Sequence, residues 1–268
     1  RDPEMSRGLG DVYKRQGEAG IQLVVDATDP NTGNMMAGYV QGIVGQALQS
    51  GTQSSPIVQT HLLFNPQMKS AYNFVPGVMG LILMLICAMM TSISIVREKE
   101  TGTMEVLLVS PVRPLFIVLA KAVPYFVLSF VNLTTILLLS VFVLDVPVVG
   151  SLFWLVMVSL LFIFVSLALG LLISSVTSTQ VAAMLASGMI LMMPTMVLSG
   201  MIFPVESMPV ILRAISDIIP ARWYIQAVRK LMIEGVPVVL VLKEIGILLL
   251  MAVVLITISI RKFKYRLE

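Results

Sequence analysis

Residues 97–113 read REKETGTMEVLLVSPVR, a charged stretch that separates two long apolar runs. The preceding residues 71–96 contain no charged side chain, whereas residues 97–105 contain five. Charged side chains are costly to hold in the hydrocarbon core of a bilayer, so this stretch must lie outside it. It therefore divides the chain into membrane spans on either side.

The second half of this stretch has the pattern of a short amphipathic helix. Met104, Leu107 and Leu108 recur at the i, i+3, i+4 spacing that places apolar side chains on one helical face. Gly102 provides a flexible turn before this helix, and Pro111 ends it. We expect a helix within 97–113 that lies along the membrane surface with its apolar side toward the lipid.

The composition is that of an integral membrane protein. Hydrophobic residues make up 57% of the chain and charged residues only 12%, against roughly 25% charged in a soluble domain. The net charge of +3 comes partly from residues 261–266, RKFKYR, so it indicates membrane orientation and not a nucleic-acid partner. Cys87 is the only cysteine, which excludes an internal disulfide.

Residues 17–70 have a soluble character. Apolar runs at 21–25 and 57–64 predict two short strands, and the apolar stripe from Met36 to Leu48 predicts an amphipathic helix between them. This order favours a crossover with parallel strands. Because so short a piece buries little apolar surface, it should not be stable alone. We therefore expect it to be the C-terminal part of a small extracytoplasmic α/β domain.

Two further features of the N-terminal part stay outside the fold prediction. Residues 1–16, RDPEMSRGLGDVYKRQ, do not match the character of residues 17–70 and predict a non-native tag or cloning scar, with a native polar tail as the alternative. His61 is the only histidine, and without a second histidine or a cysteine beside it we expect no metal site.

Residues 71–268 form the predicted membrane domain, a polytopic α-helical bundle. Five apolar runs are long enough to cross a hydrocarbon core of ~30 Å at a rise of about 1.5 Å per residue. The predicted spans are 73–96, 116–144, 148–173, 181–201 and 238–260. Only the polar residues 174–180, SSVTSTQ, divide the third span from the fourth.

An odd number of spans places residues 17–70 and the C-terminus on opposite sides of the membrane. The side that holds residues 97–113 and the RKFKYR tail is rich in Lys and Arg, which the positive-inside rule assigns to the cytoplasm. We therefore expect residues 17–70 to be extracytoplasmic and the C-terminus to be cytoplasmic. A full-length form with one further N-terminal span would have six.

Residues 202–235 are too polar to span the membrane and too apolar to form a free loop. We expect a re-entrant helical segment that dips into the outer leaflet, with its aromatic residues at the membrane interface. Two roles stay open, namely a connector that caps the helices and a lid on an exit path. The candidate outer-gate residues are Phe203, Pro204, Pro220, Trp223 and Tyr224.

Several stretches together resemble the membrane subunits of type 2 ATP-binding cassette (ABC-2) exporters that carry an extracytoplasmic domain. They are FNPQMKSAYNFVPGVMG at 64–80, VREKETGTMEVLLVSPVRPLFIVLAK at 96–121, LSGMIFPVESMP at 198–209 and IPARWYIQAVRKLMIEG at 219–235. VVDATDPNTGN at 24–34 also resembles the closing part of that family's outer domain. The first span and most of the outer domain have no counterpart here, so the resemblance implies an N-terminally truncated permease of the multidrug-export kind.

The resemblance implies that residues 97–113 are the coupling helix, which docks on a separate ATP-binding cassette ATPase subunit. The residues implied in this contact are Arg97, Glu98, Lys99, Glu100, Thr101, Gly102, Thr103, Glu105 and Arg113. The sequence supports a borrowed energy source, because it contains no G-x-x-x-x-G-K-[ST] phosphate loop. This chain would then be no enzyme and bind no cofactor of its own, with ATP and Mg on the partner.

The resemblance further implies a bacterial cytoplasmic (inner) membrane location, a second permease copy in a homo- or heterodimer, and a periplasmic adaptor. From it we expect outward transport of drug-like or lipidic molecules. Polar and flexible side chains within the spans are candidates for the substrate path, although the same side chains also serve ordinary helix packing. The four candidates are Asn132, Thr135, Met192 and Met196.

Other function classes fit the sequence less well. An ion-coupled secondary transporter needs ionisable groups inside the membrane, and residues 146–205 carry none. A membrane-anchored structural or sensor protein would not require the 97–113 stretch. An intramembrane hydrolase would need a motif such as H-E-x-x-H or G-x-S-x-G, and the sequence contains neither.

Overall fold

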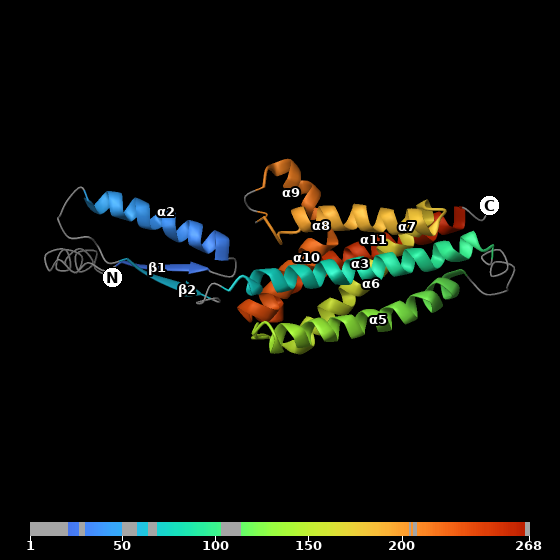
Figure 1. The fold of residues 1–268 in the computed structure, drawn as a ribbon, viewed down its shortest axis with the longest axis horizontal. Coiled ribbons are helices and arrows are strands. Elements are labelled where there is room, and N and C mark those ends of the chain that lie inside the picture. Colours follow the sequence, from blue (N-terminus) through green and yellow to red (C-terminus); the bar gives the residue numbers. More distant parts are fainter. Residues whose placement is uncertain are drawn as a thin grey trace. The chain divides into compact units, whose positions relative to one another are not determined.

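The computed structural model describes residues 21–26, 30–49, 58–63, 69–102, 114–203, 205 and 208–265. The chain divides into two compact units whose boundary falls between Tyr72 and Asn73, two residues from the boundary expected after residue 70. The first unit holds the blue helix and strands of Figure 1, and the second is a bundle of helices.

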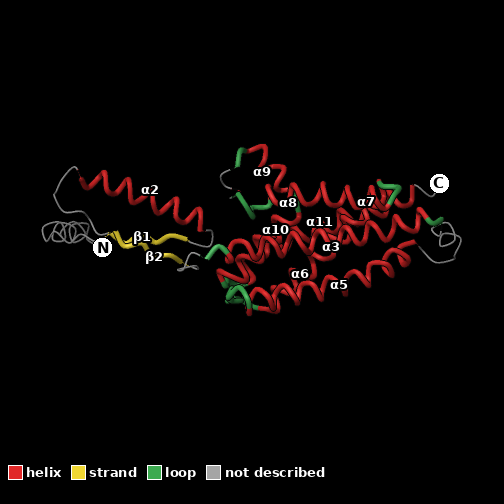
Figure 2. Tube along the Cα trace, viewed as in Figure 1, coloured by secondary structure: helices red, strands yellow, loops and turns green. Residues whose placement is uncertain are grey.

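The first unit contains two strands and a helix among its described residues, β1 (Ile21–Asp26), α2 (Pro30–Gln49) and β2 (Val58–Leu63). The strands pair in parallel, from Ile21 opposite Val58 to Asp26 opposite Leu63. Parallel neighbours cannot be joined by a tight hairpin, so the chain needs a crossover, and α2 supplies it. The predicted strand, helix, strand order is therefore present (Figure 2), whereas membership of a larger extracytoplasmic domain stays a prediction.

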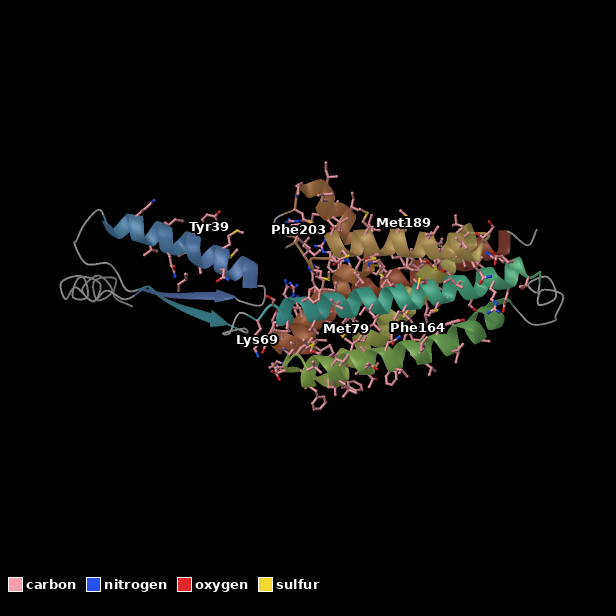
Figure 3. All side chains as sticks on the ribbon, in the orientation of Figure 1. Tyr39, Lys69, Met79, Phe164, Met189 and Phe203 are labelled. Atoms are coloured by element: carbon pink, nitrogen blue, oxygen red, sulfur yellow. The ribbon has the colours of Figure 1, made fainter. Side chains whose placement is uncertain are left out.

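Helix α2 turns only part of the predicted apolar stripe toward the strands, since Val40 and Val44 of the stripe are half-buried. The buried residues Gly33 and Ala37 lie one turn apart on a helix that packs on both strands. Met36, Tyr39 and Ile43 belong to the predicted stripe but are exposed, Tyr39 at 68% (Figure 3). A sheet of two strands covers only part of a helix, and it covers the side where small residues permit close approach.

The second unit is helical, and five of its described segments are long and apolar enough to cross a membrane. The first three are α3 (Ala71–Glu100), α5 (Pro114–Phe142) and α6 (Leu152–Val176). The fourth, Gln180–Leu198, consists of α7 (Gln180–Ser187), the π-helical η1 (Gly188–Met192) and α8 (Met193–Leu198). The fifth consists of η4 (Val238–Val241) and α11 (Leu242–Tyr265), so the five predicted spans are confirmed.

Two span boundaries differ from those that hydropathy predicts. Helix α3 continues four residues beyond Val96, because a helix can complete its last turn in water after the apolar run ends. The third span was expected from residue 148, but α6 begins only at Leu152. Before it, the backbone N–H of Val149 donates to the carbonyl of Met232, 2.9 Å away, in the π-helical η3 (Lys230–Glu234).

Helix α6 forms the centre of the bundle. It packs on α5, α7, α11 and α10 (Pro220–Arg229), and Leu155, Phe162 and Ile163 on it are buried. Helix α5 lies on one side of α3 and α6 in Figure 1, and α7 and α8 lie on the other. A Cβ at Gly170 of α6 would be 2.5 Å from the backbone oxygen of Ala88 in α3, so these two helices touch through a residue without a side chain.

The predicted outer segment 202–235 is helical in its described part. It contains α9 (Val210–Asp217), α10 and η3. Pro220 occupies the first turn of α10, where its missing N–H costs nothing, and Gly235 ends η3 with a φ of +64°. The turn between α9 and α10 is closed by the indole N–H of Trp223, which donates to the Asp217 carbonyl at 2.9 Å. Insertion of this segment into the outer leaflet stays a prediction.

Candidate functional site

The first residues of the predicted coupling stretch lie on the last turn of α3. Residues 97–100 end this span, and the surface helix that the sequence predicts after Gly102 lies outside the described residues. Gly102 follows with a φ of +72°, the left-handed conformation that commonly ends a helix. The Arg97 carbonyl accepts from both the backbone N–H and the hydroxyl of Thr101, each at 3.0 Å. Residues 103–113 lie outside the described residues.

Lys99 and Glu100 tie this end of α3 to two other helices. The Lys99 ammonium group donates to the backbone carbonyl of Ser174 in the last turn of α6. The Glu100 carboxylate accepts from the backbone N–H of Gln180, the first residue of α7, at 2.9 Å. It also accepts from the side-chain amide of Gln180. We call these contacts of Lys99 and Glu100 with Ser174 and Gln180 the helix-end contacts.

The start of α7 receives a further partner from its own chain. The Thr179 hydroxyl accepts from the backbone N–H of Ala182 at 3.2 Å, the usual contact of an N-cap residue. Two of the N–H groups that a helix leaves unpaired at its N-terminus are thus satisfied, one by Thr179 and one by Glu100. The α6–α7 turn is therefore held by Thr179 within the turn and by Glu100 from α3.

The predicted coupling residues divide into three groups. Arg97, Thr101 and Gly102 are exposed and Glu98 is half-buried at the end of α3. Lys99 and Glu100 make the helix-end contacts inside the chain, whereas the resemblance had assigned them to a partner. The third group, Thr103, Glu105 and Arg113, lies outside the described residues.

Ser174 and Gln180 were not among the candidates from the sequence, although a signal for them exists. The polar SSVTSTQ turn follows an even number of spans after the 97–113 stretch, so both must lie on the same side of the membrane. Nothing in the local pattern shows that they touch, because the contacting residues are 75 and 80 positions apart.

A buried pair of hydroxyls joins α3 to α7 a second time. The Ser92 and Ser187 side-chain oxygens are 3.0 Å apart, and neither side chain is exposed to solvent. Inside the bundle, the Cys87 sulfur is likewise 2.8 Å from the Ser129 hydroxyl of α5. Small polar side chains of this kind join membrane helices where no water is present.

The predicted outer-gate residues differ in their exposure. Phe203 is exposed, whereas Pro220, Trp223 and Tyr224 are buried. Tyr224 was expected at the membrane interface, but its ring stacks on Phe162 with centroids 4.1 Å apart, and its hydroxyl is 2.8 Å from that of Ser159. An aromatic residue with a polar tip suits an interface or a core with a hydrogen-bond partner, and Ser159 provides the latter. Pro204 lies outside the described residues.

The candidate path residues form two separate pairs. Asn132 and Thr135 lie on α5, and the Thr135 hydroxyl donates to the Val131 carbonyl of its own helix at 2.9 Å. Met192 is exposed on η1 and Met196 is half-buried on α8. In Figure 1, α5 with the first pair lies on one side of α3, and α8 lies on the other. In the described residues, no three His, Cys, Asp or Glu side chains come together to hold a metal ion.

A comparison with protein families gives one match. A family model described as ABC-2 family transporter protein matches residues 8–261. The match begins inside residues 1–16, whose non-native origin stays a prediction. It includes both units and all five candidate spans.

Curated relatives of this chain are named as transporters. The chain is 38% identical over 258 residues to the probable multidrug ABC transporter permease YbhS of Escherichia coli. This alignment covers 93% of this chain and 68% of YbhS. It is 31% identical over 221 residues to the probable multidrug ABC transporter permease YbhR of Escherichia coli, which covers 81% of this chain and 60% of YbhR. It is 30% identical over 172 residues to ABC transporter G family member 20 of Dictyostelium discoideum, which covers 64% of this chain and 23% of that protein. No solved structure matches this chain.

Proposed function

Because this chain belongs to the ABC-2 family and is a membrane permease of that class, we propose that it moves drug-like or lipidic molecules outward with energy from a separate ATPase. The word multidrug in the names of two relatives supports this class of substrate. The observation that carries the coupling step is the charged end of α3, which leaves the span at residues 97–102 and holds the α6–α7 turn.

The ATP site in this proposal lies on a partner ATP-binding cassette subunit, together with Mg. The sequence of this chain contains no G-x-x-x-x-G-K-[ST] loop to hold the phosphates. The partner meets the 97–113 stretch, where Glu98 and Glu105 would face basic side chains of the partner. The permease receives movement from that contact, and no chemical step takes place on it.

Two copies of the permease would complete the transport path. The apolar windows of α5 and of Gln180–Leu198 are only 17% and 22% buried, which leaves faces for lipid or for a second copy. Closure of two ATPase subunits on ATP would push the 97–113 stretch of each copy and tilt the spans attached to it, which opens the path outward. Tilting as a rigid body is favoured by the close packing of α3 on α6 at Gly170.

The proposal places this protein in the bacterial cytoplasmic membrane. With five spans, the positive-inside rule supports residues 17–70 outside and the basic C-terminal residues 261–266 in the cytoplasm, on the same side as the 97–113 stretch. A periplasmic adaptor would then have access to the 17–70 segment and to the predicted outer segment 202–235.

The test is a charge reversal in the full-length protein, co-expressed with its ATPase. Like charges across an interface cost several kcal/mol, so we expect Glu98→Lys with Glu105→Lys to lower ATP-dependent export about tenfold or more. The matched control is Glu98→Gln with Glu105→Gln, which removes the charges without reversing them and should lower export less. Membrane abundance, measured by immunoblotting, should be equal in all three proteins.

Two results would contradict the proposal in different ways. Normal export by the doubly reversed protein would reject the role of these carboxylates in coupling. Export by the unaltered permease in vesicles without any ATPase would reject the ATP-driven function and favour an ion-coupled secondary transporter.

A further inference from the structure

The charges of Lys99 and Glu100 match the helix ends that they contact. The last carbonyls of a helix are unpaired and carry partial negative charge, and the first N–H groups are unpaired and carry partial positive charge. Lys99 contacts the carbonyl end of α6, and Glu100 contacts the N–H end of α7. Exchange of the two residues would place each charge against the wrong helix end, so the contacts depend on the order of the charges as well as on their presence.

Helix α7 is bonded to α3 at both of its ends. Its first residue, Gln180, bonds to Glu100, and its last residue, Ser187, bonds to Ser92. These two contacts are one α7 length apart, so a shift or tilt of the α3 end must displace α7 as well.

The second half of the same span is held elsewhere. Helix α8 packs on α9 and α10, and the Ser216 hydroxyl of α9 donates to the Leu198 carbonyl at the end of α8. Between the two halves lies η1, whose π-helical hydrogen bonding is a known site of bending, and Pro194 is the second residue after it. Met189 in η1 is 72% exposed (Figure 3), so the side chains of this bundle do not enclose the segment at that point.

We propose that Lys99 and Glu100 are positioning residues that carry movement of the 97–113 stretch into α7, so that the Gln180–Leu198 span bends at η1. This proposal rests on the proposed function, since it takes the ATPase as the source of the movement. It assigns the two residues to contacts within the permease, whereas Glu98 and Glu105 meet the partner.

The sharpest test is Gln180→Pro, because proline removes both hydrogen bonds to Glu100 without breaking α7. Proline lacks the backbone N–H and suits the first position of a helix. The preceding Thr179 has φ −122° and ψ 149°, the extended conformation that a residue before proline requires. The matched control is Gln180→Ala, which removes only the side-chain contact and keeps the N–H bond at 2.9 Å.

The quantity to measure is the number of substrate molecules exported per ATP hydrolysed, in vesicles that contain the permease and its ATPase. We expect Gln180→Pro to lower this ratio about fivefold or more, the lower end of typical coupling between sites, and Gln180→Ala to lower it less. Membrane abundance and co-purification with the ATPase should stay at the level of the unaltered protein. If Gln180 had a merely structural role, its substitution would lower the amount of permease in the membrane. The permease that remains would export the same number of substrate molecules per ATP.

A second variant exchanges the charges, Lys99→Glu with Glu100→Lys. It keeps the net charge of the stretch and leaves α7 itself unaltered. It therefore still tests the proposal if Gln180→Pro lowers the amount of permease in the membrane. We expect the same loss of export per ATP, with ATPase binding retained.

The outcomes separate this proposal from the proposed function. One outcome is that export requires the ATPase while the exchanged protein keeps the normal export per ATP. That result would show that Lys99 and Glu100 do not transmit the movement, and the transport function would stand. Loss of ATPase co-purification in the exchanged protein would place both residues in the docking surface and would also overturn the proposal. Export without the ATPase would reject the function itself.

Discussion

At Gly170 an added methyl group would meet the backbone of a neighbouring helix. A Cβ there would lie 2.5 Å from the Ala88 oxygen and 3.0 Å from the Ala88 Cα in α3. Gly77 has an even shorter approach of 2.2 Å, but to the side chain of Met201, which can change rotamer. Backbone atoms of a helix cannot move away in that manner, so α3 and α6 would have to separate.

We therefore predict that Gly170→Ala lowers the free energy of unfolding by about 1–3 kcal/mol, the usual cost of overpacking a core. The control is Gly246→Ala in α11, where a Cβ would meet nothing within 4 Å. Alanine favours the helix over glycine by up to about 1 kcal/mol, so this control should be neutral or slightly stabilising. The measurement is the thermal unfolding midpoint in detergent, and equal midpoints for the two variants would show that α3 and α6 do not touch at Gly170.

Residue type alone did not place the aromatic side chains of the outer segment. Tyr and Trp have an apolar body and a polar tip, which suits a membrane interface and equally suits a core that offers a partner. Tyr224 has that partner in Ser159, and Trp223 has it in the Asp217 carbonyl. Folding alone brings both partners close to these side chains. The sequence therefore predicted the membrane interface, whereas the structure has both side chains buried in the protein.

At the scale of elements, an ion pair joins η3 to α11. The Lys230 ammonium group donates to a carboxylate oxygen of Glu244, 2.7 Å away. The Glu244 side chain is only 4% exposed, whereas that of Lys230 is 35% exposed. A carboxylate that is so far removed from water depends on a nearby cation, because the desolvation of an unpaired charge is costly.

This geometry predicts an asymmetric result for the two partners. Lys230→Met leaves the Glu244 carboxylate buried without its cation and should cost about 3–5 kcal/mol of stability. Addition of Glu244→Gln to Lys230→Met removes the buried charge and should restore much of that loss. Unfolding midpoints of the single and double variants test this, and a double variant as unstable as the single one would show that the pair does not hold η3 on α11.

The spans were predictable because one physical quantity, the thickness of the hydrocarbon core, fixes both their length and their apolar character. Helix ends were less predictable, since the backbone of α3 continues through residues 97–100 after the apolar run has stopped. The helix-end contacts and the Ser92–Ser187 pair could not be predicted, because they join residues from 75 to 95 positions apart and leave no periodic pattern.

At the scale of the whole molecule, the five spans of the described residues determine a topology. Five crossings, which the lengths and compositions of these helices allow, predict that residues 17–70 and the C-terminus lie on opposite sides of the membrane. The count follows from helix length and composition, whereas the orientation follows from the positive-inside rule applied to residues 97–113 and 261–266. A measurement of sidedness therefore tests the count and the orientation separately.

The final prediction concerns the accessibility of two introduced cysteines in intact cells. A maleimide that cannot cross the membrane should label Gln59→Cys directly and should label Lys264→Cys only after permeabilisation. The natural Cys87 is 0% exposed, so the unaltered protein should give no signal and serves as the background control. Labelling of both positions from the same side would require an even number of crossings and would contradict the five-span topology. Labelling of Lys264→Cys alone in intact cells would keep the five spans but invert the protein, and the 97–113 stretch could then not reach a cytoplasmic ATPase.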